Sequence, residues 1–274
     1  MQQRAHKMDE LGFDFNNAVA WFLHQQEQPY VLVKLTTEQV DQLVSDTAIA
    51  VRRCYITDQL LTEASTASGL TKSEVLASRL PDPGSTMAGD FGEILGYFYQ
   101  STKELPEFAI GAKKWRLKQD RSKPAPKSDV VHFLMPDRPH SSTEDSILCA
   151  EVKVKSTAGT STPIASAIED SAKDQTSRLA STLVWLRERA MTEPKQLGDV
   201  DIPLLNRFIN LIDHPPISRR FYAVAVVCES MIEQELLAAP DTPSTDFTLL
   251  VIVVPNLKKT YESMFNAMRD TLEE

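Results

Sequence analysis

The sequence lacks the long apolar runs of a membrane protein, because none of its runs approaches the roughly 20 residues that span a bilayer. Its start, MQQRAHKMDE, also lacks the apolar stretch of a signal peptide. With 42% hydrophobic and 24% charged residues, the composition is that of an ordinary soluble globular protein. These features exclude an integral membrane protein and predict a cytoplasmic location.

Cysteine is scarce, and Cys54, Cys149 and Cys228 lie far apart among apolar neighbours. An odd number of such residues is typical of reduced core thiols rather than of disulfides. The five histidines show none of the spacings that hold zinc. Any bound metal is therefore expected to have oxygen ligands.

Positive charge is also in short supply, because the chain carries a net charge of -9. Phosphate neutralisation supplies most non-specific affinity for nucleic acid, so this balance argues against a protein that wraps DNA by itself. One segment, residues 113–127 (KKWRLKQDRSKPAPK), has seven basic residues and one acidic residue, a balance of +6 that leaves -15 elsewhere. It is either a solvated loop or a DNA-contacting patch. Its position just before Asp129 favours the patch, with these predicted DNA-binding residues: Lys113, Lys114, Arg116 and Lys118.

The chain divides into two portions, with a predicted boundary near residue 86. Residues 1–86 form an N-terminal α/β portion, in which a strand over 30–35 precedes helical apolar spacing over 36–61. Residues 64–85 are rich in Ser, Thr, Pro and Gly and predict a connector, although 72–80 is also compatible with a short helix. This portion has no catalytic candidates, so it is the predicted docking surface for a partner.

Residues 87–274 give a helix, three strands, a helix and further strands, which predicts an α/β fold with a mixed central sheet flanked by helices. The predicted elements are a helix over 87–102, strands over 108–117, 129–135 and 147–155, helices over 162–190 and 202–212, strands beginning at 221 and 247, and a helix from 257. The last two strands are uniformly apolar and are therefore expected to be central in the sheet.

The strand over 147–155 carries a charged pair, Glu151 and Lys153, in the run CAEVKVKST. Residues two apart on a strand share one face, so both side chains point the same way. On an edge strand the pair is merely solvated, and an isolated E-x-K pattern is common. On a core strand, buried charge costs several kcal/mol unless it is paired or bound to a metal.

The preceding strand decides between these alternatives. It begins at Asp129 in SDVVHFLMP, and the polar segment that follows predicts a hairpin that brings Asp129 near Glu151. Two carboxylates beside a lysine can hold a divalent cation through oxygen and keep an ammonium near its water. Phosphodiester hydrolysis needs this arrangement.

Another carboxylate comes from the helix over 87–102. Gly89, Gly92 and Gly96 lie on one face of it together with Glu93. Each glycine costs roughly 1 kcal/mol relative to alanine in a helix, and close approach of the helix to the sheet explains that cost. Glu93 is then placed to face the strand ends, although an exposed glutamate in a frayed helix start is the plain alternative.

Glu93 on a helix, Asp129 on one strand and Glu151-Val152-Lys153 on the next resemble the E…D…E-x-K core of the PD-(D/E)xK nucleases, whose fold is restriction-endonuclease-like. The resemblance implies that Asp129 and Glu151 ligate Mg²⁺ or Mn²⁺, that Glu93 adds a ligand directly or through water, and that Lys153 orients or activates the water. Family members often place a basic or amide side chain on the following helix, which implies Lys173 or Gln175 for contact with DNA. Ser128 stands where the family name has proline.

A narrower resemblance is to the HamA family of nuclease subunits from the Hachiman anti-phage defence system. It is carried by chain length, the G-x-x-G-E-x-x-G helix, the S-D-V and E-V-K strands and the N-terminal portion. It implies a helicase partner, HamB, and degradation of DNA. The alternatives are a non-catalytic adaptor that docks a helicase and a restriction-type nuclease that reads its own site. The acidic balance and the lack of a base-reading module count against the last.

Overall fold

The computed structural model describes residues 9–107, 109–210 and 212–272. Over these residues, a seven-stranded mixed sheet has the order β1-β2-β7-β6-β5-β4-β3. Its strands are β1 (His24–Gln26), β2 (Val31–Lys34), β3 (Ala109–Gly111), β4 (Val130–Leu134), β5 (Ser146–Lys155), β6 (Ser218–Cys228) and β7 (Thr248–Val254). The predicted fold class, a mixed central sheet flanked by helices, is confirmed.

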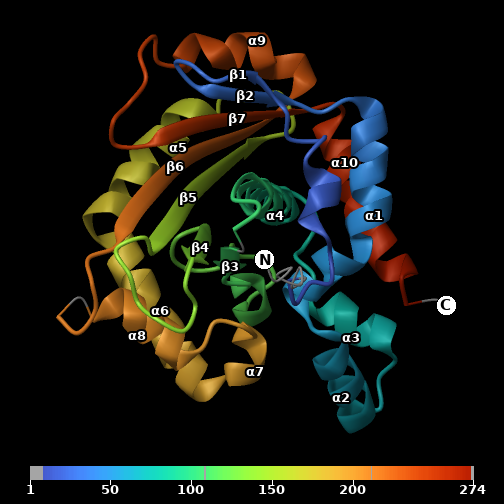
Figure 1. Cartoon of the computed structure of the whole chain (residues 1–274). Coiled ribbons are helices and arrows are strands. Elements are labelled where there is room, and N and C mark those ends of the chain that lie inside the picture. The colour runs from blue at the N-terminus through green and yellow to red at the C-terminus, as the bar shows by residue number, and fades with distance from the viewer. Residues whose placement is uncertain (1–8, 108, 211, 273–274) are drawn as a thin grey trace.

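Helices cover both faces of this sheet (Figure 1). The helices are α1 (Thr37–Tyr55), α2 (Asp58–Ser68), α3 (Lys72–Arg79), α4 (Ser85–Lys103), α5 (Pro163–Lys173), α6 (Leu179–Thr192), α7 (Pro194–Leu197), α8 (Ile202–Ile209), α9 (Ile232–Glu235) and α10 (Leu257–Asp270). One core lies between the sheet and α1, α4 and α10, and two others lie between the opposite face and α5, α6 and α8. No helix of the described residues has the length and apolar character needed to cross a membrane.

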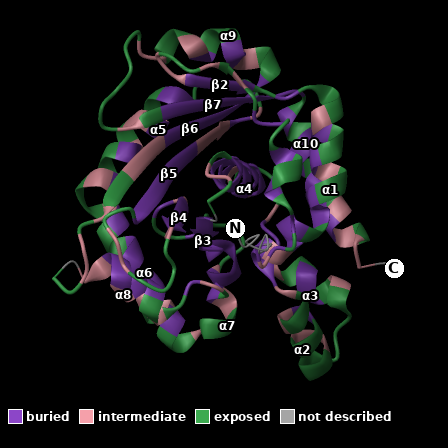
Figure 2. Ribbon diagram, viewed as in Figure 1, coloured by how far each residue is buried: buried purple, intermediate pink, exposed green. Residues whose placement is uncertain are grey.

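Parallel pairing of β5, β6 and β7 fills the centre of the sheet. Figure 2 shows these strands buried over most of their length, which confirms the expectation that the two uniformly apolar strands are central. Strands covered on both faces need apolar residues at every position rather than at alternate ones. The sequence pattern and the layer arrangement therefore agree.

The N-terminal portion contributes strands to the same sheet. β2 pairs in parallel with β7, with Val33 opposite Ile252, and β1 pairs with β2. The helix α1 begins at a capping box, in which Thr36 and Gln39 bond each other's backbone N–H, and it packs along α10. Residues before 86 are thus joined to later ones by hydrogen bonds across strands. The domain boundary near residue 86 stays a prediction.

The glycines of α4 have different surroundings. A Cβ on Gly92 would lie 2.3 Å from Cγ2 of Val154, so α4 approaches β5 too closely for any larger residue there. A Cβ on Gly96 would make ordinary contact with Val152. Gly89 has open space around it and borders a groove instead. Close helix–sheet packing therefore explains one of the three glycines directly.

Three predicted elements are corrected. The strand expected over 108–117 is the short β3 followed by a 3-10 helix, η2 (Lys114–Leu117), while Phe108 itself lies outside the described residues. The helical stretch over 36–61 divides into α1 and α2, because Ile56 is extended between them. The long helix over 162–190 is interrupted by a π-helical segment, η3 (Asp174–Arg178).

The connector expected over 64–85 is mostly helical. It contains the end of α2 and the whole of α3, the optional short helix. The last of the helices between β5 and β6, α8, ends at Ile209 rather than at 212, and Leu211 lies outside the described residues. The predicted elements keep their order, and β1, α7 and α9 are additions that were not predicted.

Candidate active site

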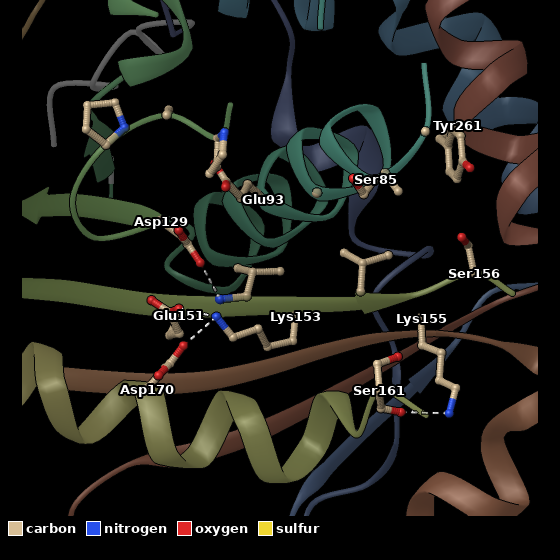
Figure 3. A pocket seen from close by; sticks show the side chains of 18 of the residues that line it. Ser85, Glu93, Asp129, Glu151, Lys153, Lys155, Ser156, Ser161, Asp170 and Tyr261 are labelled. Atoms are coloured by element: carbon tan, nitrogen blue, oxygen red, sulfur yellow. Dashed lines mark hydrogen bonds and ion pairs between the residues drawn. The ribbon is translucent and has the colours of Figure 1, made fainter. Parts of the chain in front are cut away.

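The four predicted catalytic residues border one groove of about 1290 Å³. Glu93 comes from α4, Asp129 directly precedes β4, and the remaining pair, Glu151 and Lys153, lies on β5. Figure 3 shows their side chains converging, with α4 on one side of β5 and α5 on the other. The floor and wall of the groove also include Lys127 and Arg178. The structure therefore brings all four residues together.

The hairpin between β4 and β5 places the first two carboxylates. Val130 lies opposite Ala150 in this antiparallel pair, so Asp129 enters the strand beside Glu151. The Asp129 carboxylate is fixed further because its Oδ2 accepts a 2.8 Å hydrogen bond from the backbone N–H of Val152. The predicted hairpin is confirmed, and it is the local cause of the carboxylate pair.

Glu151 is almost fully buried, and both of its oxygens are held. Lys153 Nζ donates to Oε1 at 2.6 Å, and Arg178 Nη2 donates to Oε2 at 2.6 Å. Burial, together with the nearby Asp129 charge, still raises the pKa of Glu151 to about 7 despite these cations. A buried carboxyl group with a raised pKa beside a groove is typical of a functional site.

Lys153 has a second carboxylate partner that was not expected from the sequence. Asp170 on α5 accepts from its Nζ at 2.6 Å, as Figure 3 shows. Burial alone would raise the pKa of Asp170, but bonds from Lys153 and Lys173 lower it to about 2. Burial likewise opposes the charge on Lys153, yet Asp170 and Glu151 raise its pKa above the usual value. Lys153 is therefore an ammonium held in place by two carboxylates.

Glu93 is buried beneath the groove and is held by the segment that follows β3. Trp115 Nε1 donates to Glu93 Oε2 at 2.9 Å, and Lys114 Nζ lies 3.5 Å from the same oxygen. Burial raises the pKa of Glu93 well above its usual range, and Asp129 adds to that effect. Both contacts come from η2, so this short helix positions the third carboxylate.

The predicted basic DNA-binding patch is corrected. The first four basic side chains of residues 113–127 are buried against acidic partners rather than exposed to DNA. The ion pairs are Lys113–Asp9 at 2.9 Å, Lys114–Glu93 at 3.5 Å, Arg116–Glu10 at 3.2 Å and Lys118–Asp90 at 2.8 Å. Buried cations require such partners, and here they lie far away in sequence. Of the basic residues of this segment, only Arg121, Lys123 and Lys127 are exposed.

Arg178, which the sequence did not single out, contacts the candidate site, whereas the DNA contact suggested for Lys173 or Gln175 stays a prediction. Lys173 is exposed and pairs with Asp170, and Gln175 donates to the carbonyl of Asp246 at 3.3 Å. Neither contacts the four predicted residues, whereas Arg178 reaches Glu151. The π-helix ends at Arg178, and one additional residue per turn shifts its direction relative to a regular helix. Helical spacing alone therefore misses it.

The residues present fit one hydrated Mg²⁺ or Mn²⁺ better than a cage made only of protein ligands. Within the described residues, no cluster of three or more His, Cys, Asp or Glu side chains is arranged to hold a metal. Asp129 and Glu151 nevertheless supply two neighbouring carboxylates at an open groove. Mg²⁺ commonly uses one or two carboxylates and keeps several waters. Oxygen ligands of this kind match the donor set expected from the sequence.

A mixed sheet flanked by helices, with carboxylates from α4, β4 and β5 gathered in one groove, is consistent with a restriction-endonuclease-like fold. The chain belongs to the HamA family, because the family model matches residues 19–268. Membership of this family indicates a component of a Hachiman defence system. No curated protein matches the chain.

Proposed function

We propose that this chain is a Mg²⁺- or Mn²⁺-dependent deoxyribonuclease that acts as the effector of a Hachiman anti-phage complex. The observation that carries the proposal is the meeting of Asp129 and the buried Glu151 at an open groove, with the Lys153 ammonium bound to Glu151 at 2.6 Å. An adaptor that only docks a partner has no need of a buried carboxylate with a raised pKa. Family membership supports the defence role.

Each side chain has a definite part in this proposal. Asp129 and Glu151 would supply carboxylate oxygens to the metal, and Glu93 would contribute through water. When bound, the cation polarises a water molecule and the phosphate together. Lys153, held by Glu151 and Asp170, keeps its ammonium beside the attacking water. Arg178 fixes the second oxygen of Glu151 and so maintains its orientation.

The proposal includes a helicase partner resembling HamB that delivers DNA to the groove. With four basic side chains of residues 113–127 engaged in buried ion pairs, a net charge of -9 leaves little surface for holding phosphates. A partner that moves along DNA raises its local concentration at the site. The isolated chain should therefore bind DNA with a dissociation constant weaker than about 1 µM at near-physiological salt. The N-terminal portion is the proposed docking surface.

A cleavage assay on plasmid and linear DNA, with and without the helicase subunit, tests this function. Activity should require Mg²⁺ or Mn²⁺ and be lost in Ca²⁺ or EDTA, because water activation needs a tightly ordered cation. Glu151→Gln and Lys153→Met should each lower the rate at least about a hundredfold, with the helicase complex and the melting curve retained. Glu188 lies at an exposed position on α6, and Glu188→Gln is the matched carboxylate control, which should leave the rate unchanged.

Two results would contradict the proposal. Cleavage in excess EDTA would remove the metal mechanism, and full activity in both Glu151→Gln and Lys153→Met would remove the proposed site. Complete absence of cleavage by the intact helicase complex, with every divalent ion tried, would favour the adaptor instead. A submicromolar affinity of the isolated chain for DNA would remove only the delivery step.

A further inference from the structure

We propose that Lys114 is a fixed cation built into the candidate metal site, which takes the place of a second metal ion and limits the site to one. This inference rests on the proposed metal-dependent function. Lys114 is here a positioning residue, because its buried Nζ acts on Glu93 and Asp129 rather than on DNA.

The position of the ammonium is the first observation. Lys114 Nζ lies 3.5 Å from Glu93 Oε2 and 3.6 Å from Asp129 Oδ1, between the carboxylate of α4 and the one before β4. Its side chain is only 4% exposed. Both separations are longer than an ordinary hydrogen bond, so the ammonium lies between the two carboxylates and balances their charge without bonding closely to either.

The second observation is that this buried ammonium has no hydrogen-bond partner among the described residues. Other buried lysines of the chain do: Lys113 donates to Asp9 at 2.9 Å, and Lys155 donates to Glu235 at 2.7 Å. A buried charge without hydrogen bonds is unfavourable, and the usual remedy is a closer carboxylate. The Lys114 ammonium instead lies beyond ordinary hydrogen-bond distance of both carboxylates and interacts with the charge of each.

Its neighbours prevent Lys114 from leaving this position. Lys113, the preceding residue, is locked to Asp9, and Trp115, the next one, is bonded to Glu93 at 2.9 Å. The two anchors point Lys114 into the carboxylate cluster from a four-residue 3-10 helix. The cation is therefore permanent, unlike a bound ion, which exchanges.

The consequence for metal binding follows from charge. With Lys114 present, one positive charge already lies between Glu93 and Asp129, so this carboxylate pair has less negative charge to offer a second divalent ion. Without Lys114, Glu93 and Asp129 would face each other as uncompensated carboxylates, which favours a second divalent ion between them.

Titration of the full chain with Mn²⁺ alone, without DNA, tests the inference by electron paramagnetic resonance. The number of Mn²⁺ ions bound by Asp129→Asn is subtracted from the number bound by each other protein, which corrects for ions bound outside the site. The unaltered chain should bind one Mn²⁺ at the site. Lys114→Ala should bind two and show the spin-coupled signal of a close Mn²⁺ pair, whereas Lys114→Arg, which keeps the charge, should bind one. Lys72→Met, at an exposed position on α3, is the matched control for loss of one positive charge.

A pair of ions in the unaltered chain, or a single ion in Lys114→Ala, would overturn the inference. If Lys114→Ala does not fold without metal, the double variant Glu93→Gln/Lys114→Ala removes both charges. It should fold in EDTA and bind one ion, and two ions in this double variant would also overturn the inference. No specific Mn²⁺ binding at all, with the Asp129→Asn count equal to that of the unaltered chain, would instead sink the proposed metal-dependent function.

Discussion

Two neighbouring lysines, Lys113 and Lys114, enter two polar clusters of opposite character. Lys113 bonds Asp9 at 2.9 Å and lies over the ring of Tyr97, whose hydroxyl donates to the other oxygen of Asp9 at 2.7 Å. Lys114 has no hydrogen bond among the described residues and stands between carboxylates beside an open groove. The first cluster is closed, because the side chains of Lys113, Asp9 and Tyr97 are hydrogen-bonded to one another, whereas the Lys114 ammonium of the second has no such bond. Satisfied buried networks specify a fold, whereas unsatisfied ones tend to mark functional sites.

The comparison extends to the titrating groups of each cluster. In the closed cluster, His132 is bonded at both ring nitrogens, by Gln100 and Ser101, each at 2.9 Å, and burial lowers its pKa to about 3. In the open cluster, burial raises the pKa of Glu151 to about 7. Both groups are pushed toward their neutral forms by burial, but only Glu151 borders space in which a cation can bind.

The largest effect on stability is expected at Lys113. Lys113→Met leaves the buried Asp9 carboxylate without its cation, and breaking such a pair costs about 3–5 kcal/mol. Urea unfolding measures this loss. The double variant Asp9→Asn/Lys113→Met should recover most of it, because no uncompensated charge remains.

Lys123→Met supplies the control for that comparison. Lys123 belongs to the same basic segment, but its pair with Asp120 is exposed, so the change should stay within about 0.5 kcal/mol. A loss at Lys113 as small as that at Lys123 would show that the closed cluster does not stabilise the fold.

The next effect concerns pH and His132. Its pKa of about 3 in the folded chain lies below the ordinary value of 6.5, so the unfolded chain gains a proton first as pH falls. The contribution of His132 to the free energy of unfolding is therefore fully present above pH 6.5. Between pH 6.5 and about pH 3 it decreases by about 1.4 kcal/mol per pH unit. Lys113 and Asp9 are the charged groups that act on this imidazole. Between pH 6.5 and 5, the free energy of unfolding should change less with pH in His132→Gln than in the unaltered chain. Equal pH dependence in the two proteins would contradict the assignment.

Much of the fold and part of the candidate site could be predicted because their signals are local. The E-x-K pair, the polar turn and the start at Asp129 lie within one hairpin, whose pairing gives the register directly. The uniformly apolar composition of two strands likewise predicts their central position in the sheet. The family resemblance to HamA is confirmed by a match over residues 19–268. The roles of the individual site residues stay predictions.

What could not be predicted depends on partners distant in sequence. The sequence indicates that Lys113 and Arg116 are surface charges, because their partners, residues 9 and 10, lie more than 100 positions earlier. Arg178 escapes helical spacing because of the π-helical segment before it. Asp170 had no visible signal either, since an acidic residue on an amphipathic helix is ordinarily solvated.

Substitutions at Arg178, which lines the groove, and at its neighbours Lys173 and Gln175 should have different effects on cleavage. Arg178→Gln removes the guanidinium from Glu151, and loss of such an orienting contact typically costs about 10- to 100-fold in activity or metal affinity. Lys173→Ala and Gln175→Ala should change the cleavage rate by less than about twofold, since neither side chain touches Glu151. Cleavage by the helicase complex measures all three. A greater loss at Lys173 than at Arg178 would restore Lys173 as the functional residue of this helix.

The smallest expected effect is the difference in Mg²⁺ affinity between substitutions at Asp129 and Glu93, the two carboxylates nearest Lys114. Asp129→Asn should weaken Mg²⁺ binding at least about tenfold, because Asp129 is the proposed direct ligand and its charge is lost. Glu93→Gln should weaken it less, because the glutamine oxygen can still accept from Trp115 and the carboxylate is engaged by Lys114 rather than by the metal. Calorimetric titration with Mg²⁺ provides the two affinities, and melting curves in EDTA confirm that both variants fold. A loss at Glu93 equal to or larger than that at Asp129 would make Glu93 a direct ligand and would require Lys114 to move aside when the metal binds.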